Sequence, residues 1–205
     1  MIRNLCKAIT LLLAVAALTA CVSRPGPDAG WTVLIDGDKG LENWNRLGDA
    51  NWRAGGGAIV ADSGKGGFLV SKNSYKDFRL RAEFWAERTT NSGIFIRAAN
   101  PAQIGANNSY EINIWDERPD PTYGTGAIVG FAPIDHPMPL AGGRWNTFDI
   151  VARGNRIVVT LNGVRVVDMT HGAFAQGPFA LQYGAGVGGA PGGPIIWRKV
   201  EIRSL

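Results

Sequence analysis

Alternation of apolar and polar residues is the feature that most constrains the fold of this chain. From Trp31 onward, short alternating runs are separated by Gly, Pro, Asn and Asp. The breaks recur about every eight to twelve residues, as in all-β proteins, and no long segment has helical spacing. The chain is therefore predicted to form an all-β fold of two packed antiparallel sheets, a sandwich. The clearest predicted strands cover 78–85, 93–97, 110–115, 145–153, 156–161, 164–168, 179–183 and 195–203.

One turn between these runs is specified by its residues. Asn162-Gly163 stands between two alternating runs. Both central residues of a type I′ turn need a positive φ, which Asn and Gly tolerate best. A two-residue β-hairpin is therefore predicted here.

The N-terminus has the order of a bacterial lipoprotein signal. Arg3 and Lys7 precede an apolar stretch over 9–17, and Leu18-Thr19-Ala20-Cys21 closes it. In such signals the preceding segment is removed and the cysteine is acylated. The apolar stretch is shorter than the ~20 residues that a membrane-spanning helix needs. The alternative interpretation is an ordinary signal peptide in which the cysteine is coincidental.

We therefore predict a signal peptide over 1–20, a lipidated Cys21 with a Pro/Gly-rich linker to residue 30, and one domain over 31–205. The lipid would tether the protein to a membrane in the bacterial cell envelope. Val22, where an Asp would favour retention at the inner membrane, makes the outer membrane the expected location.

The charge and the cysteine content exclude some partners and some kinds of site. The chain has 21 Lys and Arg against 17 Asp and Glu, a net charge of +4. Loss of Arg3 and Lys7 with the signal leaves 19 against 17, so the mature net charge is +2. These charges are interspersed, and nucleic acid is not an expected partner. With Cys6 removed and Cys21 lipidated, no thiol remains for a disulfide or a thiolate metal site.

The outward residues of three predicted strands suggest a ligand-binding face. If the strands over 78–85, 93–97 and 110–115 are neighbours, these residues share one surface. Aromatic rings that stack on sugars, mixed with amides and charges that bind hydroxyls, favour a carbohydrate ligand over an ordinary solvated sheet face. The residues in question are Trp85, Arg97, Glu111, Asn113 and Trp115.

Several segments follow one another in a known order: Trp31 to Gly37 (WTVLIDG), Asn91 to Arg97 (NSGIFIR), Tyr110 to Asp116 (YEINIWD), and Leu181-Gln182. Together they resemble the 3-keto-disaccharide hydrolase domain family. The resemblance extends from about Trp31 to Leu205. It implies a concanavalin-like jelly roll that acts on sugars whose C3 hydroxyl has been oxidised to a ketone. The ketone acidifies C2–H, so a base can start elimination of the C1 substituent, and hydration completes a net hydrolysis.

The resemblance also implies site residues. Glu111 is the expected base, acid or metal ligand. Arg97 would hold a sugar oxygen or the enolate charge, with an ion pair to Glu111 as the alternative. Asn113 stands where many relatives have Gln and would bind a hydroxyl, and Asp116 and Gln182 are further candidates for the same cleft. Trp85 and Trp115 are substrate-binding candidates from the alternation alone. His136 lies outside the family pattern, but it stands in a Pro-rich loop, and a histidine can serve as a base near neutral pH, so it is a candidate base.

Three alternatives stay open. A metal held by Glu111, Asp116 and a histidine has no supporting spacing motif, so a divalent cation is only a candidate cofactor. A retaining glucanase needs two carboxylates about 5 Å apart, whereas the run here is Glu111-Ile-Asn113-Ile-Trp115. A non-catalytic carbohydrate-binding lipoprotein would share the fold, because fold alone does not determine function.

Overall fold

The computed structural model describes residues 30–134, 140–186, 188 and 192–205. Nearly all regular structure in it is β-strand, and every strand lies between Thr32 and Ser204. The two helices that it contains are single 3-10 turns, η1 (Leu41–Asn43) and η2 (Pro121–Tyr123). No helix in this part of the chain is long and apolar enough to cross a membrane.

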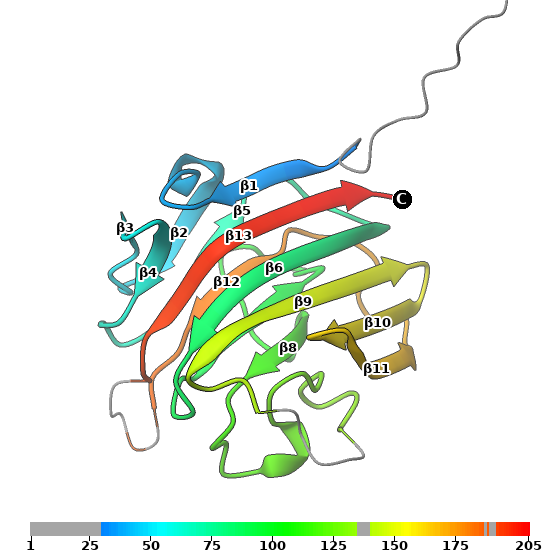
Figure 1. Ribbon diagram of the computed structural model, residues 1–205. Coiled ribbons are helices and arrows are strands. Elements are labelled where there is room, and N and C mark those ends of the chain that lie inside the picture. Colours follow the sequence, from blue (N-terminus) through cyan, green and yellow to red (C-terminus); the bar gives the residue numbers. More distant parts are fainter. Residues whose placement is uncertain (1–29, 135–139, 187, 189–191) are drawn as a thin grey trace, which may run out of the picture.

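Two antiparallel sheets pack face to face, as Figure 1 shows. The larger sheet has eight strands in the order β11-β10-β9-β6-β13-β4-β3, with β1 also paired to β13. Its strands are β1 (Thr32–Asp36), β3 (Arg53–Gly55), β4 (Ala58–Ala61), β6 (Phe78–Ala86), β9 (Arg144–Arg153), β10 (Arg156–Leu161), β11 (Val164–Thr170) and β13 (Ile195–Ser204).

The smaller sheet has five strands in the order β2-β5-β12-β7-β8. They are β2 (Trp44–Gly48), β5 (Gly67–Ser71), β7 (Ser92–Ile96), β8 (Tyr110–Ile114) and β12 (Ala180–Tyr183). The predicted all-β jelly-roll sandwich is thus confirmed, and all eight predicted strands form.

The predicted hairpin is confirmed as well. Asn162 and Gly163 join β10 to β11 with φ of 51° and 82°, the positive values that a type I′ turn requires. Asn162 also accepts a hydrogen bond from the Thr147 amide at 2.9 Å, which ties this turn to β9.

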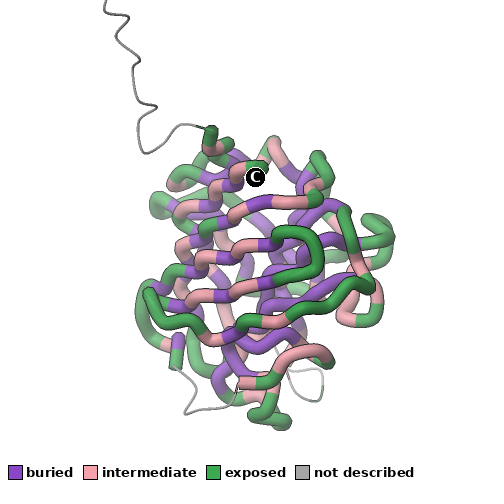
Figure 2. The backbone as a smooth tube through the Cα atoms, turned by 90° about the vertical axis from the view of Figure 1, so that its right-hand side faces the viewer, coloured by how far each residue is buried: buried purple, intermediate pink, exposed green. Residues whose placement is uncertain are grey.

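The core lies between the sheets and comes from alternate residues of both. On β6, buried Phe78, Leu80, Ala82 and Phe84 alternate with more exposed residues. This is the period of two that places successive side chains on opposite faces of a strand. Figure 2 shows the same alternation of buried and more exposed positions along neighbouring strands. The core residues that the structure describes lie between Leu34 and Ile202, so we expect a chain that begins at residue 22 to fold.

Candidate active site

The outer face of the smaller sheet, which points away from the core, carries the candidate site. Pairing between its five strands lines up outward-facing residues in two cross-strand rows. In the first row Ala180 pairs with Phe95, and Phe95 with Glu111; in the second, Gly93 pairs with Asn113. β12 also pairs Leu181 with Ile94 of β7, and the Gly184 N–H donates a hydrogen bond to Asn91 O at 2.9 Å. The same register places Gln182 beside Gly93. The first row is Asn45, Val70, Ala180, Phe95 and Glu111; the second is Leu47, Phe68, Gln182, Gly93 and Asn113.

Glu111 is the buried carboxylate of this face. Only 8% of the residue is exposed, and no described residue forms a hydrogen bond with its carboxylate. Burial raises the pKa of Glu111 from 4.5 to about 7, and the positive charge of Arg118 opposes part of that rise. Glu111 therefore exchanges a proton near neutral pH, as a general base must.

Gly93 leaves space next to this carboxylate. A Cβ atom there would lie 3.5 Å from Cγ of Glu111 and 3.5 Å from Cε2 of Phe95. The side chain of Glu111 thus leans over a sheet position that has no side chain of its own. A ligand can approach the backbone at this position.

Two amide oxygens flank the position of Gly93. Oδ1 of Asn113 and Oε1 of Gln182 are both buried and have no hydrogen-bond partner among the described residues. The other amide group of Asn113 is held in place, because its Nδ2 donates to Tyr123 O at 2.6 Å. A buried polar atom without a partner costs about 1–3 kcal/mol, so both oxygens favour a ligand or water that donates to them.

Arg118 is a site residue that sequence reasoning missed. Its charge acts on Glu111, but the two do not form an ion pair within 4 Å. Its guanidinium Cζ lies 5.9 Å from the centre of the Trp115 ring, and its Nε is buried without a described partner. Arg118 comes after β8 ends, in a segment with no strand periodicity, so no pattern in the sequence marks it.

A groove of about 760 Å³ runs along the same face. Phe68, Gln182 and Ile104 contribute to its lining. Ile104 belongs to the segment between β7 and β8 and packs on the outer apolar cluster of Val70, Phe95 and Ala180. A second hollow of about 420 Å³ next to β2 and β5 includes Val70, Ala98 and Pro101.

The structure corrects the prediction for Arg97. The residue is 1% exposed, and its guanidinium donates to Lys76 O at 2.9 Å and to Gly154 O at 2.8 Å. Its φ of 54° ends the alternation of β7, so the side chain leaves the face that extended backbone would give it. The alternative ion pair with Glu111 is also wrong, since the acid nearest to Arg97 is Asp77 at 3.4 Å. Arg97 holds segments of backbone together.

Trp85 and Asp116 also lie elsewhere than predicted. Trp85 is on β6, which belongs to the larger sheet, so it cannot share a face with Glu111. The Asp116 carboxylate accepts hydrogen bonds from Thr125 Oγ1 at 2.7 Å and from the amides of Ala141 and Gly142. It fixes the long β8–β9 connection and has no oxygen directed to a ligand.

Some of the remaining candidate residues lie near Glu111, and others fall outside the part of the chain that the structure describes. Asn113 and Trp115 lie at or next to the Glu111 face, as the alternation predicts, and Gln182, which the family resemblance suggested, lies on the same face. His136 and Cys21 fall outside the described residues. His171 is exposed, and its Nδ1 lies 3.0 Å from Oη of Tyr110.

Among the described residues, no group of three or more His, Cys, Asp or Glu side chains could hold a metal ion. The proposed ligand set of Glu111, Asp116 and a histidine does not assemble there, because the carboxylate of Asp116 is engaged by backbone amides.

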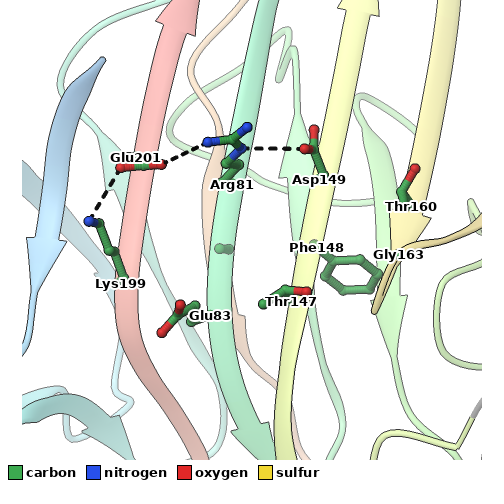
Figure 3. A pocket seen from close by; sticks show the side chains of 10 residues that line it. Arg81, Glu83, Thr147, Phe148, Asp149, Thr160, Gly163, Lys199 and Glu201 are labelled. Carbon is green, nitrogen blue, oxygen red and sulfur yellow. Dashed lines mark hydrogen bonds and ion pairs between the residues drawn. The ribbon is translucent and has the colours of Figure 1, made fainter. Parts of the chain in front are cut away.

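Another hollow, of about 400 Å³, lies on the outer face of the larger sheet (Figure 3). Its charged groups neutralise one another: Arg81 lies 3.4 Å from Asp149 and 3.6 Å from Glu201. These carboxylates are ion-paired and face solvent, whereas Glu111 is buried and forms no ion pair within 4 Å with any described residue. The chemistry of a candidate active site is therefore found on the smaller sheet.

Comparison with protein families gives one match over most of the chain. Residues 30–203 match the 3-keto-alpha-glucoside-1,2-lyase-like domain. The chain belongs to this family. The resemblance identified from its motifs is thereby confirmed, and no curated protein matches the chain.

Solved structures similar to this member of the 3-keto-alpha-glucoside-1,2-lyase-like family agree in fold. A candidate glycosyl hydrolase from Parabacteroides distasonis superposes with a TM-score of 0.70 at 15% identity, covering 86% of this chain and 94% of that one. A second from the same organism gives 0.67 at 24% identity, covering 85% and 99%. The carbohydrate-binding module CBM66 from Bacillus subtilis gives 0.52 at 16% identity, covering 85% and 96%. At these identities the likeness shows the jelly-roll fold.

Proposed function

We propose that this protein is an exported lipoprotein that cleaves 3-keto-glycosides. The observation that carries the proposal is Glu111, a carboxylate with a pKa of about 7 that leans over the open position of Gly93. Membership of the 3-keto-alpha-glucoside-1,2-lyase-like family supports the same substrate class.

The reaction begins with proton transfer. The ionised carboxylate of Glu111 accepts the proton from C2 of the sugar, and the C2–H electron pair forms a C2=C3 double bond while the C3 oxygen takes the negative charge. The enolate then re-forms the ketone, C1=C2 becomes the double bond, and the C1–O bond breaks. The departing oxygen takes a proton and leaves as an alcohol. Addition of water across C1=C2, with oxygen at C1 and a proton returned to C2, completes the net hydrolysis.

Residues near Glu111 could stabilise the enolate, bind the sugar hydroxyls and hold the leaving group. Arg118 supplies the positive charge that would stabilise the C3 enolate oxygen, an electrostatic effect that is strong in a poorly solvated site. The unpaired oxygens of Asn113 and Gln182 would accept hydrogen bonds from sugar hydroxyls. The groove lined by Phe68 and Ile104 would hold part of the leaving group.

Double displacement with two carboxylates has less support. On the strands of the smaller sheet, as far as the structure describes them, Glu111 is the sole carboxylate. A retaining glycosidase needs a second one about 5 Å away. Cleavage that depends on the ketone requires only one base.

The deciding experiment compares 3-keto-glucosides with their unoxidised parents as substrates for the wild type and for Glu111→Gln. We expect alcohol release from the keto substrates alone, reduced at least ~100-fold in the variant, because Gln cannot accept a proton. Equal cleavage of the unoxidised parents would contradict the proposal. Saturable glycan binding without any turnover would favour the alternative of a carbohydrate-binding lipoprotein.

A parallel assay with a chelator tests for a divalent cation. Loss of turnover that added metal restores would add a metal to the site. Unchanged turnover would leave proton transfer by Glu111 and charge stabilisation by Arg118 as a sufficient description.

The proposal also places the protein in the cell envelope, anchored at Cys21 and facing the periplasm or the surface. Expression of the full chain with labelled fatty acid tests this part. Label on the wild type and none on Cys21→Ala is the expected result. A mature protein without fatty acid would show an ordinary signal peptide instead.

A further inference from the structure

The two sheets differ strongly in charge. The strands β6, β9, β10, β11 and β13 of the larger sheet carry nine basic and four acidic residues. The five strands of the smaller sheet carry one of each, Arg46 and Glu111. None of the charged residues on the larger sheet is buried, so the surplus of five positive charges faces outward.

Part of this surplus gathers around one hollow of about 380 Å³. Arg79 pairs directly with Arg203 across β6 and β13, and Arg153 pairs directly with Arg156 across β9 and β10. Like charges directly opposite each other on a sheet are destabilising unless an anion lies between them. The hollow is lined by Arg79, Val151, Arg153, Arg156, Val158, Arg203 and Leu205.

Only two of these four arginines have a carboxylate partner. Arg79 forms an ion pair with Asp149, and Arg156 with Asp168 at 2.7 Å. Arg153 and Arg203 form no ion pair with any residue that the structure describes. In the adjacent hollow, by contrast, Lys199, Glu201, Arg81 and Asp149 form a continuous chain of matched charges (Figure 3). The arginine-lined hollow therefore holds two arginines, Arg153 and Arg203, whose charges no described carboxylate balances.

The chain enters the fold next to this hollow. A Cβ at Gly30 would lie 3.4 Å from Cδ of Arg203, and the guanidinium of Arg203 lies 5.0 Å from the centre of the Trp31 ring. Arg81 covers the same ring at 4.5 Å. Trp85 and Trp145 pair with each other on this outer face, and Trp145 is 41% exposed. Tryptophan and arginine together are typical of surfaces that lie at a membrane–water interface.

The length of chain before Gly30 limits the distance to a membrane. Nine residues, 22–30, separate Cys21 from Trp31. Fully extended, they reach about 30 Å. A lipid on Cys21 would keep this face of the larger sheet within about that distance of the bilayer surface.

We propose that the outer face of the larger sheet rests on an anionic phospholipid bilayer, with Arg153 and Arg203 binding lipid phosphates and Trp31 lying at the interface. The orientation builds on the proposed lipid anchor and turns the Glu111 face of the opposite sheet away from the membrane. Substrate then reaches the groove from solution.

The test uses residues 22–205 without lipid, so that its outcome does not depend on acylation of Cys21. Co-sedimentation with phosphatidylglycerol/phosphatidylcholine vesicles is expected, with little binding to pure phosphatidylcholine. The double variant Arg153→Ala/Arg203→Ala should lower the partition coefficient about 30-fold, and added salt should lower it further. The matched control Arg46→Ala/Lys72→Ala removes two exposed charges elsewhere and should bind like the wild type.

Hydrogen exchange locates the contact. On anionic vesicles, amide exchange should slow in the turn between Arg153 and Arg156 and around Trp31, and stay unchanged around Gln182. No binding to anionic vesicles would overturn the proposal, as would equal loss in the control variant. Binding of inorganic phosphate that Arg153→Ala/Arg203→Ala abolishes, without vesicle binding, would also overturn it and indicate a soluble phosphorylated ligand. Fatty-acid labelling of the full chain reports separately on the anchor itself.

Discussion

A methyl group placed on Gly93 would lie 3.5 Å from Cγ of Glu111. The carboxylate that we propose as the base thus leans over a residue whose lack of a side chain opens the sheet to a ligand. A Cβ there would also lie 3.0 Å from the carbonyl oxygen of Ile112, which leaves little room for it to move away. A side chain at residue 93 would therefore occupy the space in which a ligand can reach the Glu111 carboxylate.

Gly93→Ala should raise KM for the keto-glycoside about tenfold or more, because the added methyl occupies the space that the sugar needs. Steady-state kinetics measures this, and Gly55→Ala is the matched control. Gly55 also lies on a strand, and a Cβ there would have no atom within 4 Å. An unchanged KM in Gly93→Ala would show that substrate does not bind over this position.

Activity should depend on ionisation of Glu111. Because its pKa is about 7 and the base must be ionised, kcat/KM should fall about tenfold per pH unit below pH 7. Measurement of kcat/KM from pH 5 to pH 9 tests this. A rate that stays level down to pH 5 would exclude a group with this pKa as the base.

The same ionisation should affect stability in the opposite direction. Burial raises the pKa of Glu111 in the folded state above its unfolded value of 4.5. Stability is therefore highest below about pH 4.5 as far as this group is concerned, and it declines as the pH rises to about 7. The full difference corresponds to about 3 kcal/mol of unfolding free energy. Glu111→Gln should match the wild type in Tm at pH 4 and exceed it at pH 8.5, and equal values at both pH would contradict the burial of this charge.

Arg97 and Arg118 should respond to substitution in opposite ways. Arg97→Met leaves the carbonyls of Lys76 and Gly154 without their donors, which should cost about 3 kcal/mol and lower Tm by about 6–12 °C. The folded fraction should keep its kcat/KM within about twofold.

Arg118→Met, in contrast, should leave Tm within about 2 °C and lower kcat/KM at least ~100-fold, since it removes charge that the enolate needs. Thermal unfolding and kinetics of both variants separate the two roles. A large loss of activity in Arg97→Met with normal stability would return Arg97 to the active site.

Gln182 and Trp85 test which sheet binds the sugar. Gln182→Ala removes the unpaired oxygen beside Gly93 and should raise KM about tenfold, the effect of one lost hydrogen bond of about 1.4 kcal/mol. Trp85→Ala, on the larger sheet, should leave KM unchanged. The reverse result would place the substrate on the larger sheet.

The sequence by itself determined eight of the thirteen described strands and the two sides into which the residues of each strand divide. Alternation depends only on neighbouring residues in extended backbone, so the buried side of β6 and the shared side of Glu111 and Asn113 on β8 could be predicted directly. Alternation did not predict that β8 is buried on both sides. The Asn162-Gly163 turn is equally local. Family motifs, which record residues in order, pointed to Glu111 and to the carbohydrate-active fold.

Only the tertiary structure decided which strands share a sheet, and therefore which side chains share a surface. Trp85 alternates as predicted, but β6 joins the larger sheet, and that pairing depends on contacts far apart in the chain. Arg97 shows the second reason, because one residue with a φ of 54° redirects a side chain that alternation would place beside Glu111. Arg118 and Gly93 become site residues only through packing: the burial that raises the pKa of Glu111 and the open position beneath it are properties of the assembled sheet.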